Sequence, residues 1–312
     1  MQAKRPLIII AGATAVGKTD MSIGLAKKIG GEIISADSMQ VYKGMDIGTA
    51  KIKPEEMKGI RHYLIDELEP TEEFNIFEFK SRAVKYINEI YDKGKIPIIV
   101  GGTGFYIQSV LYDIDFSDED GDKSYRSKLE EKAEKEGGDV LYDMLKNIDP
   151  KAAEEIHPNN IKRVIRALEF NHNTGMLISE HNEEQRQKES PYDFIYIVLN
   201  RERSKIYGRI EKRVDIMFDE GLVDEVKSLL DSGISPDTLS MQGLGYKETA
   251  EYLKGNLTLD EAKDLLKKNT RHFAKRQITW FKREPDAIWM NYEEHPNMAE
   301  DLYNMVIDKL DI

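Results

Sequence analysis

The sequence predicts an α/β fold: a parallel sheet flanked by helices, with an all-helical insertion. Residues 7–11 (LIIIA) and 96–102 (IPIIVGG) are apolar almost throughout, which is typical of strands buried on both faces of a parallel sheet. Such runs alternate with longer segments of helical periodicity, and this alternation indicates βαβ units. The alternation stops after Asp115 and resumes near residue 192, so the intervening segment does not belong to the sheet.

In the N-terminal part, each predicted strand is followed by a segment that leads toward a helix or a turn. The predicted strands are residues 7–11, 31–35, 62–66 and 96–102. The predicted helices are one ending near Ile29, one over residues 76–93, which stops at Asp92-Lys-Gly-Lys, and one over 103–112.

The middle of the chain has only helical periodicity. Residues 123–174 follow this pattern, with breaks at Gly137-Gly138, Asp149-Pro150 and His157-Pro158, because glycine and proline disfavour helix interiors. We therefore predict a helical insertion domain over residues 116–189. The core domain then consists of residues 1–115 and 190–312.

The C-terminal part returns to the α/β pattern. Residues 192–200 (YDFIYIVLN) and 287–291 (AIWMN) are predicted strands. The predicted helices are residues 203–230, 243–253, 259–282 and 297–309. Both ends of the chain thus contribute to one sheet.

Composition narrows the class of protein. The 312 residues are 40% hydrophobic and 33% charged, as in globular proteins. No apolar run approaches the roughly 20 residues of a membrane span, so we expect no membrane partner. Residues 1–6 lead directly into a predicted strand, which leaves no room for a signal peptide. There is no cysteine, which excludes disulfides and fits the reducing cytoplasm.

The net charge of −12 taken alone disfavours a nucleic-acid partner, because phosphate contacts dominate such binding. The charge is unevenly distributed, however. Residues 261–284 contain eight Lys or Arg and only three acidic residues. A local basic segment of this kind can bind phosphates on an acidic protein.

A phosphate-binding motif follows the first predicted strand. Residues 12–19, GATAVGKT, match G-x-x-x-x-G-K-[ST] between a strand and a helix, as in P-loop NTPase-like sheets. The glycines let backbone N–H groups approach phosphate oxygens, and the helix N-terminus adds partial positive charge. The residues predicted to bind phosphate are Gly12, Ala13, Thr14, Ala15, Val16, Gly17, Lys18 and Thr19, with Thr19 also a candidate ligand of Mg²⁺.

A P-loop does not identify the phosphate compound. The default is nucleotide binding, ATP in particular, and a small-molecule kinase is the first hypothesis. A triphosphatase usually adds an apolar strand ending in Asp. Residues 62–66 (HYLID) fit that pattern poorly and residues 96–102 end in glycines, which weakens nucleotide hydrolysis as the function.

A second polar segment, SADSMQVYKG at residues 35–44, follows the second predicted strand. Ligands of open α/β sheets bind beyond the carboxyl ends of strands, so Asp37 is expected in the same crevice as the P-loop. From the residues alone, Asp37 is a metal ligand, a base for a hydroxyl, or a group facing another reactant. Ser38 and Gln40 are suited to hydrogen-bonding a nucleobase.

Several motifs now stand in a fixed order. They are GATAVGKT, ISADSMQVYKGMDIGTAK (34–51), HYLIDELEP (62–70), IIVGGTGFYIQSVL (98–111), NNIKRVIRALEFNHNTG (159–175), RIEKRVDIMFDEGLVDEV (209–226), SMQGLGYKE (240–248) and TRHFAKRQITWF (270–281). Together they resemble the tRNA dimethylallyltransferases, also called tRNA isopentenyltransferases or IPP transferases, of the shorter bacterial type. The resemblance extends from about residue 6 to about 290. Met-Leu-Ile at 176–178 departs from a common Lys-Pro-Ile-like sequence.

The resemblance implies transfer of a dimethylallyl group from dimethylallyl diphosphate to N6 of the adenosine just 3′ of the anticodon, in tRNAs that read codons beginning with U. The P-loop would then hold a diphosphate leaving group, assisted by Mg²⁺. A diphosphate site also fits the absence of an apolar strand that ends in Asp, which a triphosphatase would usually have. The partner would be the anticodon stem-loop of tRNA, with its target base turned outward.

The resemblance also implies residue roles. Asp37 would accept the N6 proton, Arg213 and Lys18 would contact the diphosphate, and Thr103 would lie near the attacked nitrogen. Lys162 and Arg166, like Arg271 and Lys275, are spaced to share a helix face. The residues implied in tRNA binding are Asp37, Ser38, Met39, Gln40, Arg126, Lys162, Arg163, Arg166, Gln242, Gly243, Arg271, Lys275, Arg276 and Gln277.

Three alternatives stay open at the level of sequence. An adenylate isopentenyltransferase would use free AMP, ADP or ATP; the helical insertion and the basic segment favour the larger RNA acceptor. A small-molecule P-loop kinase would transfer the γ-phosphate of ATP. A non-catalytic RNA-binding protein is disfavoured by the intact P-loop and Asp37. We expect a monomer.

Overall fold

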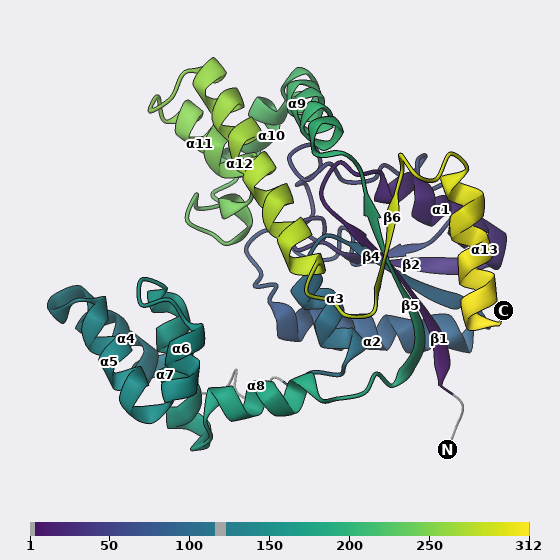
Figure 1. The fold of residues 1–312 in the computed structure, drawn as a ribbon. Helices are drawn as coiled ribbons and strands as arrows, with labels where there is room; N and C mark the ends of the chain where they lie inside the picture. Colours follow the sequence, from purple (N-terminus) through teal and green to yellow (C-terminus); the bar gives the residue numbers. More distant parts are fainter. Residues whose placement is uncertain (1–3, 116–122, 312) are drawn as a thin grey trace. The chain divides into compact units, whose positions relative to one another are not determined.

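Six parallel strands form the sheet in the computed structural model, which describes residues 4–115 and 123–311. The strand order is β3-β2-β4-β1-β5-β6, and every neighbouring pair is parallel (Figure 1). The strands are β1 (Arg5–Gly12), β2 (Gly31–Ala36), β3 (His62–Tyr63), β4 (Ile96–Gly101), β5 (Tyr192–Asn200) and β6 (Ala287–Asn291). The predicted α/β class is confirmed.

Strand β1 lies at the centre and is buried on both faces. Ile8 pairs with Ile98 of β4 on one side and with Ile195 of β5 on the other. Ile8 packs in one apolar cluster with residues of helices α1 (Lys18–Ile29) and α13 (Met298–Leu310). Ile9 is fully buried as well and, because side chains alternate along a strand, faces the opposite side of the sheet.

Helices α2 (Ile76–Asp92) and α3 (Gly104–Leu111) pack against β2 and β4. The Asn75 side chain accepts a hydrogen bond from the Glu78 amide and so caps the start of α2, as short polar residues commonly do. Among the helices of residues 4–115 and 123–311, none is both long enough and apolar enough to cross a membrane.

Between β5 and β6 the chain forms a helical layer. It comprises α9 (Arg203–Asp219), α10 (Leu222–Asp231), the 3₁₀ helix η1 (Ser240–Gln242), α11 (Tyr246–Leu253) and α12 (Leu259–Phe281). The single helix predicted over 203–230 is wrong, because Gly221, with φ of 104°, separates α9 from α10. Helices α9 and α12 pack together, and their apolar residues surround Ala13 and Ala15 of the P-loop.

Residues Tyr112–Ser190 form a second compact unit. Its helices are α4 (Lys123–Glu136), α5 (Gly138–Ile148), α6 (Pro150–Glu155), α7 (Ile161–Thr174) and α8 (Ile178–Arg186), around their own apolar cluster. The expected helical periodicity ended at residue 174, so α8 is an additional element. The predicted boundary at 115–116 adjoins residues 116–122, which lie outside the described residues. A tRNA-contacting role for residues 116–189 stays a prediction.

Strand β2, which leads to Asp37, is fixed at its start by a buried carboxylate. The Glu32 side chain is 6% exposed. It accepts hydrogen bonds from Lys95 Nζ and Tyr63 Oη, both at 2.7 Å, and lies 3.4 Å from Lys93 Nζ. Burial alone would raise the pKa of Glu32, but the hydrogen bonds from Lys95 and Tyr63 and the charge of Lys93 outweigh it, so the pKa lies below its ordinary value.

We predict that Glu32→Gln lowers the free energy of unfolding at pH 7 by about 1–3 kcal/mol. Since the folded-state pKa is depressed, the stabilisation is complete above the ordinary glutamate value of 4.5 and is lost as pH falls through the folded-state pKa. Urea unfolding at pH 7 and pH 4 measures this. The difference between wild type and variant should shrink at pH 4; a difference independent of pH would contradict the assignment.

Candidate active site

The candidate site lies where four adjacent strands end. Because β2, β4, β1 and β5 are neighbours and parallel, the segments after their carboxyl ends gather at one edge of the sheet. These segments are the turn at 37–40, the glycine-rich turn at 101–104, the P-loop at 12–19 and Arg201 with the start of α9. The predicted proximity of Asp37 to the P-loop follows from this topology.

Two glycines allow the P-loop to close against its neighbours. Gly12 has φ of 150°, and a Cβ there would lie 2.6 Å from the carbonyl oxygen of Leu199. Gly17 has φ of 112°, and a Cβ there would lie 2.8 Å from Tyr292 Oη. Helix α1 begins at Lys18 and no side chain caps it, so its first amide groups can bind an anion.

Lys18 extends back over the P-loop. Its Nζ donates hydrogen bonds to the carbonyl oxygens of Gly12 and Ala13, both at 2.9 Å. Burial lowers the pKa of Lys18 to about 8, the charge of Asp37 opposes this shift, and the charge of Arg213 adds to it. Lys18, Asp37 and Arg213 therefore lie within electrostatic reach of one another.

Three arginines converge on the P-loop from the segment after β5. Arg213 Nη1 donates to Thr14 Oγ1 at 3.4 Å, Arg209 Nε to the Ala15 carbonyl at 2.6 Å and Arg201 Nε to the Val16 carbonyl at 2.9 Å. Burial, with the charge of Arg209, lowers the pKa of Arg213.

None of these arginines forms an ion pair within residues 4–115 and 123–311. Such unneutralised cations favour a bound anion. The family resemblance implied Arg213 alone. Arg209 lies four residues before it, on the same face of α9.

Asp37 is held in a fixed orientation by its own turn. Its Oδ1 accepts hydrogen bonds from the amides of Met39 and Gln40, at 2.9 and 3.4 Å. Its Oδ2 has no hydrogen-bond partner among the residues that the structure describes. One carboxylate oxygen of a half-buried Asp37 is thus available to a ligand beside Lys18 and Arg213.

The turn at 101–104 connects these two regions. The Thr103 amide donates to the Ala36 carbonyl at 3.3 Å, so Thr103 adjoins Asp37 in space. Its hydroxyl makes no hydrogen bond within the described part of the chain. A Cβ at Gly104 would lie 2.1 Å from Trp280 Cδ1, which shows how closely α12 packs on this turn.

Gln277 of α12 joins the same turn to the P-loop. Its Oε1 accepts from the Thr14 amide at 2.8 Å, and its Nε2 donates to the Gly102 carbonyl at 3.0 Å. The residue is 6% exposed. The sequence motif implied that Gln277 contacts tRNA. Its burial instead favours a role in holding the two loops together.

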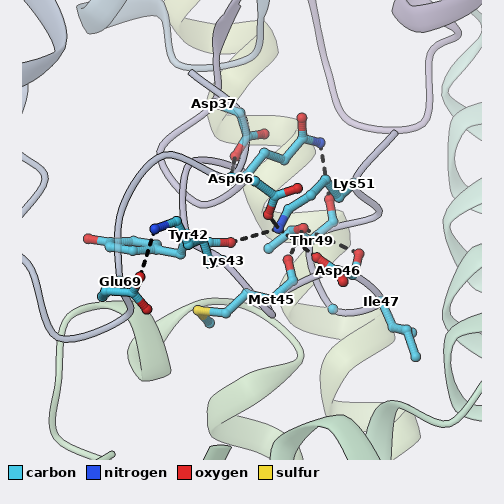
Figure 2. Close-up of polar contacts among 12 residues, drawn as sticks. Asp37, Tyr42, Lys43, Met45, Asp46, Ile47, Thr49, Lys51, Asp66 and Glu69 are labelled. Carbon is cyan, nitrogen blue, oxygen red and sulfur yellow. Dashed lines mark hydrogen bonds and ion pairs between the residues drawn. The ribbon is translucent and has the colours of Figure 1, made fainter. Parts of the chain in front are cut away.

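Of the uncharged residues predicted to bind tRNA, two more donate side-chain hydrogen bonds to the protein. Gln40 Nε2 donates to the Thr49 carbonyl at 3.2 Å, and Gln242 Nε2 donates to the Pro236 carbonyl at 2.9 Å. Gly243 packs on Met39, since a Cβ at Gly243 would lie 2.5 Å from Met39 Cε. Ser38 is half-buried at the start of the same loop, whose polar contacts Figure 2 shows.

The basic residues of α12 line an open depression of about 420 Å³. Its lining is His272, Lys275, Arg276, Thr279, Trp280 and Arg283. Trp280 also contacts the turn at 101–104 through Gly104, so the depression adjoins the candidate site. Arg271 instead pairs with Glu211 at 2.9 Å.

In the second unit, α7 presents an exposed basic face. Lys162, Arg163 and Arg166 are exposed, and none forms an ion pair with another described residue. Arg126 of α4 is exposed but pairs with Glu169 at 3.0 Å. The first three residues are therefore available to phosphate groups, whereas Arg126 would have to exchange one partner for another.

A metal site made by the protein alone is not present in residues 4–115 and 123–311, where no cluster of three or more His, Cys, Asp or Glu is placed to hold an ion. Thr19, exposed at the start of α1 beside Lys18, is the P-loop hydroxyl available for one. Mg²⁺ is commonly held by one or two protein ligands together with substrate phosphates. The residues present fit that mode.

The fold and the site define a P-loop α/β protein whose phosphate cradle is faced by a carboxylate and several arginines. The model of the IPP transferase family matches residues 40–284. The chain belongs to the IPP transferase family, as its ordered motifs predicted.

Two curated relatives cover nearly the whole chain. A tRNA dimethylallyltransferase of Lachnoclostridium phytofermentans is 60% identical over 97% of this chain and 96% of the relative. Another, of Acetivibrio thermocellus, is 51% identical over 96% of each.

Solved structures agree in fold. The full-length tRNA isopentenylpyrophosphate transferase of Bacillus halodurans is 46% identical, with a TM-score of 0.74, covering 99% of this chain and 97% of that one. A eukaryotic dimethylallyltransferase acting on tRNA is 31% identical, with a TM-score of 0.83, covering 96% of this chain and 77% of that one.

We predict that the affinity of the P-loop for an organic diphosphate falls as pH rises above 8. Lys18 is cationic below its pKa of about 8 and loses its charge above it. The dissociation constant should rise on the order of tenfold between pH 7 and 9.5, since a hydrogen bond to a charged group contributes about 1.5–3 kcal/mol. Calorimetric titration measures this. Lys18→Met should bind weakly with little dependence on pH; a flat profile for the wild type would contradict the assignment.

Proposed function

We propose that this protein transfers a dimethylallyl group from dimethylallyl diphosphate to N6 of the adenosine adjacent to the 3′ side of the anticodon, in tRNAs that read codons beginning with U. The product is N6-isopentenyladenosine. Relatives of high identity are named as tRNA dimethylallyltransferases. The observation that carries the proposal is the available Oδ2 of Asp37 beside the cationic P-loop, because this chemistry needs an anion site and a proton acceptor in one crevice.

The donor half of the reaction breaks the bond between the allylic carbon and the diphosphate oxygen, and the electron pair leaves with the diphosphate. Positive charge develops on the allyl carbons and negative charge on the leaving group. Lys18, the amides at the start of α1 and Arg213 stabilise the departing diphosphate. When bound beside Thr19, Mg²⁺ would supply further neutralisation of the phosphate charge.

The acceptor half forms a bond between N6 and the allylic carbon. The N6 lone pair is delocalised into the adenine ring, which makes the amine a weak nucleophile. Asp37 Oδ2 accepts a hydrogen bond from N6 and takes up the proton that N6 releases. The Thr103 hydroxyl, in the turn that adjoins Asp37 through Ala36, would orient the reacting groups.

The tRNA backbone would contact two basic surfaces. One is the α12 depression with Lys275 and Arg276; the other is the exposed face of α7. Phosphate contacts of this kind position the RNA, and contacts to the base edges specify the base. We further propose that the protein acts as a monomer in the cytoplasm, where unmodified tRNA is available.

Two other functions are distinguished by their substrates. An adenylate isopentenyltransferase would modify free AMP, ADP or ATP in place of tRNA, whereas the exposed cations of α7 suit a polyanionic acceptor. A small-molecule kinase would consume ATP and make no use of a prenyl diphosphate.

The test is incubation of the protein with unmodified tRNA, dimethylallyl diphosphate and Mg²⁺, followed by mass spectrometry of the tRNA nucleosides. One adenosine per substrate tRNA should gain a dimethylallyl group, and chelation of the metal should slow the reaction. Parallel reactions contain AMP in place of tRNA, or ATP in place of the prenyl diphosphate. Transfer to AMP alone, or no transfer to tRNA, would refute the proposal.

We predict that Asp37→Asn lowers kcat by about 10²–10⁴, the usual contribution of a general base. The amide oxygen can still accept from Met39 and Gln40, so the turn is preserved while the proton acceptor is removed. Filter binding of tRNA and calorimetry of the diphosphate serve as controls and should change little. Near-normal turnover would eliminate the proposed base.

We predict that combined replacement of Lys162, Arg163 and Arg166 by Ala raises the KM for tRNA and reduces the slope of log K against log salt by about 2, as loss of three phosphate contacts requires. The control replaces Lys132, Lys135 and Lys146, which lie in the same unit but are paired with acidic residues. If both triple variants changed tRNA binding equally, the effect would come from the net charge of the protein, and a defined contact with α7 would be contradicted.

A further inference from the structure

The segment that presents Asp37 and Ser38 is a long loop. Backbone hydrogen bonds join residues 40–43 to residues 66–68, and side chains restrain the rest of the loop. We call residues 37–51 the acceptor loop, because it begins with the proposed base-contacting residues. It contains no α-helix or strand and makes a single isolated bridge, between Tyr42 and Leu68. Backbone freedom in such a loop is large unless specific contacts restrict it.

The first restraint comes from Lys51, the last residue of the loop. The Lys51 side chain is 3% exposed and donates a hydrogen bond to the Tyr42 carbonyl at 2.6 Å. Its Nζ also pairs with Asp46 at 2.6 Å and with Asp66, as Figure 2 shows. One buried ammonium group thus links the backbone of Tyr42 and the side chain of Asp46, both in the loop, to Asp66 beyond it.

The second restraint comes from a different part of the chain. The carboxylate of Glu225, in α10, accepts hydrogen bonds from three consecutive backbone amides of the acceptor loop. Its Oε2 accepts from Asp46 N at 2.9 Å and Ile47 N at 2.7 Å, and its Oε1 accepts from Gly48 N at 3.0 Å. Consecutive amides that converge in this way bind an anionic oxygen strongly.

Tyr246 of α11 completes this contact. Its hydroxyl donates to Glu225 Oε1 at 2.7 Å, and the side chain is fully buried. A Cβ at Gly48 would lie 2.5 Å from the Tyr246 ring, so the loop approaches the ring as closely as a glycine permits. Gly243, against Met39, adds a contact near the catalytic end of the loop.

We propose that Glu225 is a positioning residue for the RNA acceptor: its carboxylate fixes the acceptor loop and thereby the placement of Asp37 and Ser38 against the adenine. The inference rests on the proposed function. Misplacement of a reacting group by about 1 Å costs on the order of a hundredfold in rate. Glu225 itself touches neither substrate; it acts through the loop.

The donor side of the site is anchored by other groups. Gln277 and Arg209 hold the P-loop from α12 and α9, whereas Glu225 and Tyr246 hold the acceptor loop from α10 and α11. Loosening the acceptor loop should therefore impair use of the acceptor and leave binding of the donor intact. A loss of general stability would impair both.

The test compares Glu225→Gln with wild type in the tRNA prenylation assay. The variant removes the negative charge and replaces one acceptor oxygen by an N–H₂ donor. Some of the three backbone N–H groups then lose their acceptor, and the loop is held less firmly. kcat/KM for tRNA should fall on the order of ten- to a hundredfold, while the Kd for dimethylallyl diphosphate stays within about twofold, since that site keeps all its contacts. Hydrogen exchange at the amides of residues 46–48 should accelerate. Asp224→Asn, an exposed neighbour on α10, should change none of these values.

Tyr246→Phe provides a second variant that keeps the carboxylate and its three amide contacts. It should also reduce kcat/KM for tRNA, but by a smaller factor than Glu225→Gln does. Unchanged kcat/KM in Glu225→Gln, or an equal loss of donor affinity, would overturn the inference while leaving the wild-type activity intact. Absence of transfer by the wild type would instead refute the proposed function, and this inference with it.

Discussion

The parallel alignment of β2, β4, β1 and β5 is the constraint on which the rest of the site depends. Parallel neighbours end at the same edge, so segments that are distant in sequence become adjacent without any specific attraction between them. The P-loop, the turn at Asp37 and the turn at Thr103 meet for this reason. The central strands are buried on both faces, so close packing from both sides fixes the positions of their ends.

Charge is distributed at this edge in an asymmetric way. Lys18, Arg201, Arg209 and Arg213 surround the P-loop, and Asp37 is the carboxylate whose field reaches two of them. A bound anion would compensate the repulsion between these cations. The carboxylate of Asp37 is oriented by its own turn, and its Oδ2 has no hydrogen-bond partner among the described residues.

The two reactants would be held by separate sets of helices. The P-loop packs against α9 and α12, with Gln277 as the polar bridge to the turn at 102–103. The acceptor loop packs against α10 and α11, with Glu225 as the polar bridge. Glycines at 48, 104 and 243 permit these close approaches. Such a division lets one bound substrate be positioned without disturbing the other.

The sequence by itself determined the strands, the P-loop, Asp37 and the family, because these depend on local patterns: apolar runs, glycine spacing and motif order. It also predicted the helical insertion, because residues 123–174 have only helical periodicity between their glycine and proline breaks. It did not determine the contacts of Glu225, Tyr246 and Arg209 or the buried position of Gln277. These residues look like ordinary helix-surface groups in sequence, and their partners lie about 180 to 260 residues away or in another loop. Only tertiary structure decides such contacts, because hydrogen-bond partners across a fold depend on packing geometry and leave no periodic trace in the chain.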